Sequence, residues 1–194
     1  MITVCAPPEL LEDLGEKEYK ICSKEEAPNV DSGVLLYLYE DGYHQNFNPT
    51  VTVIINEVSR TLESLHHPSI LRINGWKGFL ARDTWEIAGI VNEDVLKTIE
   101  WFGKKIIVCK DKPGFISARI LAMIINEAFF ALNEGVSTEK EIDIAMRLGT
   151  GYPYGPFEWA NLIGISHVYT LLSELNNTDP LYNACSLLAN QATL

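Results

Sequence analysis

Residues 110–121 read KDKPGFISARIL and mark the point at which the character of the sequence changes. A strand-like run, KIIVC at residues 105–109, comes directly before this segment, and Pro113 and Gly114 interrupt it. The apolar residues that follow Phe115 recur at helical spacing. We therefore predict a hinge between a strand and a helix at this point.

The first hundred residues alternate between extended and helical patterns. Their apolar runs are rich in Val, Ile, Leu and Tyr without strict alternation, which is typical of strands buried on both faces of a parallel sheet. Short helical segments are predicted between them, at residues 9–14 and 59–65. The predicted strands are residues 2–6, 19–22, 33–39, 51–56 and 70–75. This order is typical of an α/β domain, which we place at residues 1–110.

The rest of the chain, residues 111–194, reads as a series of helices. Gly135 is a natural end for the first of them, and Ser137 or Thr138 is a candidate N-cap for the second. Helices are predicted within residues 116–132, 138–148, 157–163, 167–175 and 181–190, with a loop at 149–156. The C-terminal domain is therefore predicted to be all-helical.

The composition of the chain narrows its function class. With 194 residues and a formal net charge of −11, the chain is long enough for a core and is strongly acidic. Nucleic acids and anionic membranes are bound through clustered Lys and Arg, so we expect neither as a partner. No apolar run reaches the roughly 18 residues of a membrane span, and residues 1–5 lack the pattern of a signal peptide. We expect a cytoplasmic protein that binds a small molecule or another protein.

Metal and redox sites are not predicted. The four cysteines lie far apart in the sequence, without the close spacing of zinc or redox motifs, and we expect free thiols. His66 and His67 are adjacent but have no third candidate ligand nearby.

Residues 110–164 carry a set of motifs that resembles a known family. The family pattern runs D-x-P-G-F, N-R, E-A, E-G-V, I-D, G-x-P-x-G-P-F and D-x-x-G, and it is that of the C-terminal domain of the 3-hydroxyacyl-CoA dehydrogenases. The matching residues are Asp111, Pro113, Gly114, Phe115, Arg119, Glu127, Ala128, Glu134, Gly135, Val136, Ile142, Asp143, Gly151, Pro153, Gly155, Pro156, Phe157 and Gly164.

The N-terminal half resembles the same family more faintly. Residues 53–59 are similar to the strand that carries the family's N-T-S-S motif, and residues 71–79 are similar to its R-x-x-G-x-H-F-F-N-P strand. The resemblance implies a Rossmann-like N-terminal domain. Residues 1–50 are too few for a full pair of mononucleotide-binding units, so we expect this domain to be truncated.

The resemblance also implies NAD as a cofactor, but the residues needed for it are not recognisable. A Gly-rich turn after the first strand normally lets backbone amides approach the pyrophosphate. Here residues 2–10 read ITVCAPPEL, and no glycine precedes Gly15. We therefore expect no NAD binding in the usual mode and assign no cofactor-binding residue.

The family's catalytic positions are replaced in this sequence. The resemblance implies a His general base oriented by a Glu, and matching Arg72 and Gly75 to the family strand puts Lys77 and Gly89 at these two positions. The amide of the family's N-R pair is Ala118, and Ser59 remains as a hydroxyl from the N-T-S-S motif. Because these positions are replaced, we assign no catalytic residue.

Four residues remain candidates for substrate binding: Ser59, Lys77, Arg119 and Phe157. Phe157 belongs to an aromatic group for which both loop packing and an acyl-binding surface are open interpretations. Arg119 belongs to a basic group that is either a solvated face or a contact for the phosphates of coenzyme A. The aromatic group is Tyr152, Tyr154, Phe157 and Trp159, and the basic group is Lys104, Lys105, Lys110, Lys112 and Arg119.

The preferred hypothesis is a divergent 3-hydroxyacyl-CoA dehydrogenase-like protein of acyl-CoA metabolism without NAD-dependent activity. It would act as an acyl-CoA-binding or scaffold protein and, as the resemblance implies, as a homodimer through its helical half. Two alternatives stay open. One is an active dehydrogenase with a rearranged or partner-completed site, and the other is a pure interaction protein.

Overall fold

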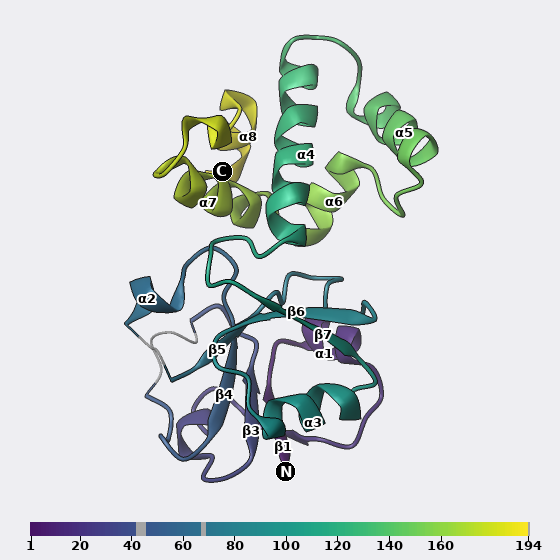
Figure 1. The fold of residues 1–194 in the computed structure, drawn as a ribbon. Coiled ribbons are helices and arrows are strands. Elements are labelled where there is room, and N and C mark those ends of the chain that lie inside the picture. Colours follow the sequence, from purple (N-terminus) through teal and green to yellow (C-terminus); the bar gives the residue numbers. More distant parts are fainter. Residues whose placement is uncertain (42–45, 67–68, 194) are drawn as a thin grey trace. The chain divides into compact units, whose positions relative to one another are not determined.

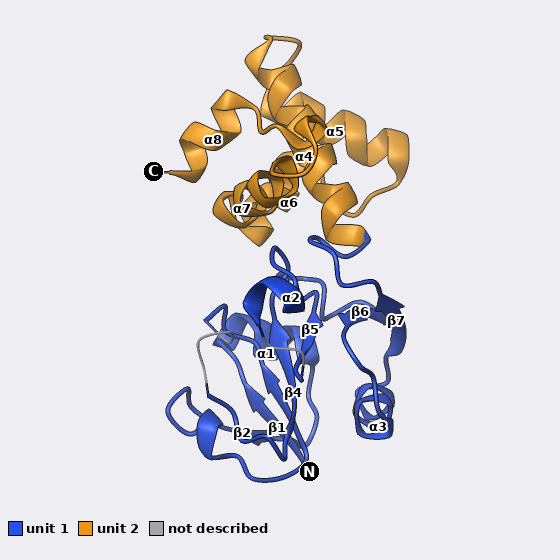
Figure 2. Cartoon of the chain, turned by 60° about the vertical axis from the view of Figure 1, so that its left-hand side comes forward, with its two compact units in different colours: residues 1–116 blue, residues 117–194 orange. Residues whose placement is uncertain are grey.

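The chain divides into two compact units, which Figure 2 shows in blue and orange. A computed structural model describes residues 1–41, 46–66 and 69–193. Unit 1 is Met1–Ile116 and unit 2 is Ser117–Leu194. The division thus falls six residues beyond residue 110, and the whole Pro113–Gly114 hinge belongs to unit 1.

Unit 1 contains a seven-stranded sheet in the order β2-β1-β3-β4-β5-β6-β7 (Figure 1). Neighbouring strands are parallel except for β5 and β6, which are antiparallel. The strands are β1 Ile2–Cys5, β2 Lys20–Ile21, β3 Val34–Tyr37, β4 Thr52–Asn56, β5 Leu71–Ile73, β6 Thr84–Ala88 and β7 Lys105–Cys109. The predicted strands are all found, with ends that differ by up to two residues. The sequence prediction missed β6.

Both faces of the inner strands of this sheet are buried, as their apolar runs predicted, whereas the edge strands β2 and β7 are largely exposed. One face packs against α1 Pro8–Leu14 and α3 Glu93–Trp101. The other face is covered by the 3-10 helix η1 Ala27–Asn29 and by α2 Leu62–Leu65. Helix α3 was not predicted, although Asn92 caps it through its side chain, which accepts from the Val95 amide.

Unit 2 is all-helical, which confirms the predicted fold class. Its helices are α4 Ser117–Asn133, α5 Glu139–Thr150, α6 Pro156–Ile163, α7 Ile165–Asn176, η3 Pro180–Tyr182 and α8 Ser186–Ala192. Thr138 is the N-cap of α5, one of the two predicted candidates.

The single helix predicted at residues 181–190 is wrong, because the chain forms η3 and α8 there with a break between them. The buried Asn126 of α4 causes the break. Its Nδ2 donates to the Asn183 carbonyl at 2.9 Å, and its Oδ1 accepts from the Cys185 amide at 2.8 Å. These backbone groups are therefore used by a side chain and not by a continuous helix.

The I-D and G-P-F motifs form one structural joint in unit 2. The buried Asp143 of α5 accepts from the amides of Phe157 and Glu158, at 2.8 and 3.3 Å, and so caps α6. A Cβ atom at Gly155 would overlap the Asp143 carboxylate, so only glycine allows this approach. The motif residues of unit 2 thus hold two helices together.

Within the described residues, none of the helices is long and apolar enough to cross a membrane.

Candidate functional site

The candidate site of unit 1 lies at the carboxyl ends of β4 and β5. In open α/β sheets, ligands bind outside the carboxyl ends of parallel strands. Four polar residues are buried there, each with less than a tenth of its surface exposed: Asn56, Glu57, Asn74 and Glu86. Burying so many polar groups costs free energy unless they form hydrogen bonds. Asn74 bonds to Glu86, while Asn56 and Glu57 bond to nearby backbone groups.

Asn74, directly after β5, and Glu86, on the neighbouring antiparallel strand β6, form a buried pair. The Asn74 amide donates to the Glu86 carbonyl at 3.1 Å, and Asn74 Nδ2 donates to Glu86 Oε2 at 2.9 Å. Arg82 also faces this carboxylate. Burial lowers the pKa of Arg82, and the negative charge of Glu86 opposes that shift. The pair is a carboxylate that orients an amide.

Asn56 joins the ends of three strands beside this pair. Its Oδ1 accepts from the Gly75 amide at 3.1 Å, and its Nδ2 donates to the Leu38 carbonyl at 3.4 Å. A Cβ atom at Gly75 would lie 2.7 Å from the Asn56 carboxamide, so the close approach of these segments requires glycine. The strand ends are therefore fixed relative to one another.

Lys77 and Gly89, the two positions taken from the family pattern, lie three residues beyond this pair. Lys77 is half-buried in the turn after β5, and Gly89 follows β6 without a side chain. The separation of twelve residues between Lys77 and Gly89 is the same as that between Asn74 and Glu86. Sequence reasoning missed the latter pair because it fixed the register on Arg72 and Gly75. The sequence did contain a signal for this pair, because Asn74 and Glu86 are each a polar residue within a strand-like segment.

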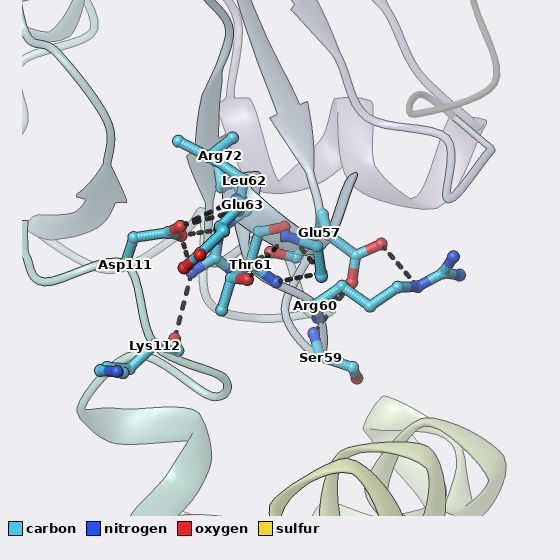
Figure 3. Close-up of polar contacts among 10 residues, drawn as sticks. Glu57, Ser59, Arg60, Thr61, Leu62, Glu63, Arg72, Asp111 and Lys112 are labelled. Carbon is cyan, nitrogen blue, oxygen red and sulfur yellow. Dashed lines mark hydrogen bonds and ion pairs between the residues drawn. The ribbon is translucent and has the colours of Figure 1, made fainter. Parts of the chain in front are cut away.

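Arg72 is fully buried and organises the C-terminal segment of unit 1 (Figure 3). Its Nε donates to Asp111 Oδ1 at 2.8 Å, its Nη1 to the Glu57 carbonyl at 2.9 Å and its Nη2 to the Lys112 carbonyl at 3.1 Å. Its guanidinium carbon lies 4.6 Å from the centre of the Phe115 ring. Burial lowers the pKa of Arg72, while the charge of Asp111 opposes that shift.

Asp111 connects this arginine to the loop after β4. Its Oδ2 accepts from the Leu62 amide at 2.8 Å, at the start of α2. The Gly114 amide donates to the Val58 carbonyl at 2.7 Å. Ser59 lies in the same loop, half-buried, and its amide donates to Glu57 Oε1 at 2.9 Å. The hinge is thus a segment bonded to unit 1, not a free linker.

The other candidates lie in unit 2. Ala118 is buried in the first turn of α4. The Arg119 guanidinium lies 5.5 Å from the centre of the Tyr182 ring, and this side chain is half-buried. Phe157 is only 4% exposed, and its ring centre is 5.0 Å from that of Phe129. Packing within the helical core therefore accounts for Phe157, and its role in substrate binding stays a prediction.

The start of α1 does not fit the pyrophosphate of NAD. Pro7 is the N-cap and Pro8 the first residue of this seven-residue helix, and neither has an amide hydrogen. The Leu10 and Leu11 amides donate to the Pro7 carbonyl at 3.1 and 3.2 Å. Gly15 lies at the far end of the helix. The backbone donors that a dinucleotide needs are therefore not presented here.

The described residues do not support a metal site either. Residues 1–41, 46–66 and 69–193 contain no group of three or more His, Cys, Asp or Glu side chains placed to hold an ion. His67 of the adjacent His pair lies outside the described residues. All four cysteines have free thiols.

Comparisons with known proteins agree with the motifs of unit 2. The family model for the 3-hydroxyacyl-CoA dehydrogenase C-terminal domain matches residues 114–193. The chain is 45% identical over 94 residues to 3-hydroxyadipyl-CoA dehydrogenase of Escherichia coli (strain K12), which covers 47% of this chain and 20% of the relative. It is 38% identical over 109 residues to 3-hydroxybutyryl-CoA dehydrogenase of Bradyrhizobium diazoefficiens, with 53% of this chain and 37% of the relative covered. The match thus spans a fifth to just over a third of the length of these relatives.

The fold is shared with solved structures over most of the chain. The crystal structure of FadB2 from M. tuberculosis superposes with a TM-score of 0.73, covering 89% of this chain and 70% of that one. At 16% identity this likeness shows the fold alone. Over its C-terminal region, residues 114–193, the chain matches the 3-hydroxyacyl-CoA dehydrogenase family, which supports the resemblance seen in its motifs.

Proposed function

We propose that this chain is a divergent 3-hydroxyacyl-CoA dehydrogenase-like protein that binds acyl-CoA as a homodimer and does not catalyse NAD-dependent dehydrogenation. The observation that carries the proposal is the buried Asn74–Glu86 pair. We assign these residues, and not Lys77 and Gly89, to the positions of the base and its orienting carboxylate. The pair has the expected separation and is hydrogen-bonded between the end of β5 and β6.

An asparagine at the base position removes the proton acceptor. Oxidation of a secondary alcohol requires a group that takes the hydroxyl proton as hydride leaves, and a positioned general base contributes about 100- to 10,000-fold. A carboxamide is not protonated near neutral pH, so Asn74 cannot replace an imidazole. Glu86 is already bonded to Asn74 Nδ2 at 2.9 Å. With Ala118 in place of the family's amide, the second polar group is missing as well.

Binding of an acyl-CoA is supported by unit 2. This unit carries the family match, and Arg119 keeps the charged half of the N-R motif with a half-buried side chain. Ser59 and Lys77 in unit 1 are also half-buried and polar. A guanidinium is well suited to the phosphates of coenzyme A, since it donates two parallel hydrogen bonds to such groups.

The homodimer is supported by the surface of α5. Asp143 is the only buried residue of this helix, while Ile144 is 39% and Leu148 is 83% exposed. An amphipathic helix normally buries its apolar residues against its own domain. A second copy of the chain would cover them, in keeping with the symmetric association that is common among oligomers. The proposal includes a cytoplasmic location, because free thiols persist in reducing compartments.

Calorimetric titration with acetoacetyl-CoA tests the binding half of this proposal. We expect saturable binding to the unmodified chain and at least about a tenfold weaker affinity for Arg119→Ala. Arg147→Ala is the matched control, because Arg147 is a half-buried arginine of the same unit that pairs with Glu158 at 3.0 Å. Absence of any heat of binding would contradict the acyl-CoA role. Equal weakening by both variants would contradict the assignment of Arg119.

The alternative of an active, rearranged dehydrogenase makes a different prediction. In that case Lys77 would act as acid or base, and Lys77→Ala would abolish turnover of acetoacetyl-CoA with NADH. We expect the unmodified chain to show no turnover, so that Lys77→Ala has no rate to lower.

A further inference from the structure

We propose that the chain closes its own dinucleotide crevice, because the Lys24–Asp41 ion pair spans the carboxyl end of β1. This inference deepens the proposed function, since it explains why NAD would not bind. It rests on the strand order and on side-chain contacts in unit 1, and not on the Asn74–Glu86 pair.

The strand order places the crevice. In doubly wound sheets, ligands bind where the order of strands reverses, outside the carboxyl ends of the two central strands. Here the reversal lies between β1 and β3, because β2 is on the other side of β1. The Cys22 amide donates to the Val4 carbonyl at 3.0 Å, and the Leu38 amide donates to the Cys5 carbonyl at 2.7 Å. Both flanks of the β1 end are therefore fixed.

The ion pair bridges these two flanks. Lys24 follows β2 and Asp41 follows β3, and the two strands lie on opposite sides of β1. Lys24 Nζ lies 3.0 Å from Asp41 Oδ2. A contact between these two side chains therefore passes over the end of the strand between them. The pKa of the Cys5 thiol agrees with this placement. Burial, and then the neighbouring Cys22, raise it to about 12, while the charge of Lys24 lowers it and that of Asp41 raises it by smaller amounts.

Two tyrosines hold the pair in place. The Tyr37 hydroxyl donates to Asp41 Oδ1 at 2.9 Å, so both carboxylate oxygens are used. Tyr37 is fully buried, and the Lys24 ammonium lies 4.2 Å from the centre of the Tyr39 ring. Burial by itself would raise the pKa of Asp41, but the hydrogen bonds from Lys24 and Tyr37 hold it below its ordinary value.

A dinucleotide would meet two obstacles at this crevice. Its pyrophosphate would have to approach the Asp41 carboxylate, a like charge, and separate it from Lys24. It would then find Pro7 and Pro8 where backbone donors are needed. We infer that neither NAD nor its nucleotide half binds unit 1.

The test measures binding and local stability, not activity. Amide shifts of Cys22 and Leu38 are followed by NMR during titration of the unmodified chain with NADH and with ADP-ribose. We expect no shifts up to millimolar ligand. Hydrogen exchange at the same amides is then compared in Lys24→Ala, Asp41→Ala and the control Lys97→Ala, which breaks the exposed Lys97–Glu93 pair. We expect exchange about two- to fivefold faster in the first two variants and unchanged in the control.

Two results would overturn the inference. One is binding of NADH or ADP-ribose with a Kd below about 1 mM together with shifts at Cys22 and Leu38. The other is unchanged exchange in both Lys24→Ala and Asp41→Ala. If NADH binds but acetoacetyl-CoA is not reduced, the closed crevice is refuted while the proposed loss of the base at Asn74 survives, so the two failures are distinguishable.

Discussion

The two units of this chain resemble known proteins in different ways, because residues 114–193 match a family model, whereas unit 1 shares a fold. In unit 2, the recognisable motif residues have structural tasks: Asp143 caps α6, and Gly155 allows the Asp143 side chain to come close to the start of that helix. In unit 1, the fold is shared with solved structures, while the positions to which we propose to assign the chemistry hold Asn74 and Pro7. A strong family signature can therefore report helix packing and say little about whether a reaction is catalysed.

The ion pairs of the two units also differ, in how deeply their charged side chains are buried. Arg72 in unit 1 has a fully buried side chain bonded to Asp111, while Arg147 and Glu158 in unit 2 are each more than a third exposed. A buried charge depends on its partner, whereas an exposed one is solvated without it. Unit 1 thus depends on one polar contact far more than unit 2 does.

The largest effect is expected from breaking the buried pair. Asp111→Ala would leave the Arg72 guanidinium buried without its carboxylate and would lower the free energy of unfolding of unit 1 by about 3–5 kcal/mol. Arg147→Ala, the control in unit 2, is expected to cost less than about 1 kcal/mol. Urea unfolding combined with hydrogen exchange of each unit measures both. A smaller loss for Asp111→Ala than for Arg147→Ala would reverse the comparison.

A smaller effect is expected at the exposed face of α5. Leu148→Ser is predicted to raise the dimer dissociation constant about tenfold, because a buried leucine at the centre of an interface would be lost. Its effect on the folding of unit 2 itself is predicted to stay within about 0.5 kcal/mol, since the side chain is 83% exposed there. Leu181, 68% exposed on η3, gives the matched control Leu181→Ser. Equal dissociation constants for the two variants, measured by sedimentation, would exclude α5 as the interface.

The smallest effect concerns acid stability. Asp41 faces Lys24, Tyr37 and the Cys5 thiol, and its folded pKa is depressed below the unfolded value of about 3.9. Its contribution to stability is therefore fully present above that pH and is lost as the pH falls through the folded pKa. Below pH 4, unfolding free energies of the unmodified chain and Asp41→Asn should converge. If the difference in unfolding free energy between the two proteins grew as the pH fell, the predicted direction of the Asp41 pKa shift would be wrong.

The strands buried on both faces could be predicted from sequence because their apolar runs are continuous. Strand β6 was missed because Glu86 stands in its centre, and the polar partner of Glu86, Asn74, lies beyond the end of β5. Helix α3 could have been found from its Asn92 cap and the spacing of Val95 and Ile99.

Much of the candidate site was beyond prediction, because its contacts join distant segments. Arg72 meets Asp111 across 39 residues, and Lys24 meets Asp41 across 17 residues through the strand order alone. The absent glycine turn, by contrast, was visible in residues 2–10, since it depends on local backbone chemistry.

The most direct test of the account is the rate at which the purified chain oxidises NADH with acetoacetyl-CoA as acceptor. We predict no rate above the uncatalysed background, and none after Asn74→His, because the restored imidazole would face a closed dinucleotide crevice. Steady turnover by the unmodified chain, abolished by Glu86→Gln or by Lys77→Ala, would contradict the claim that unit 1 has kept the fold and lost the chemistry.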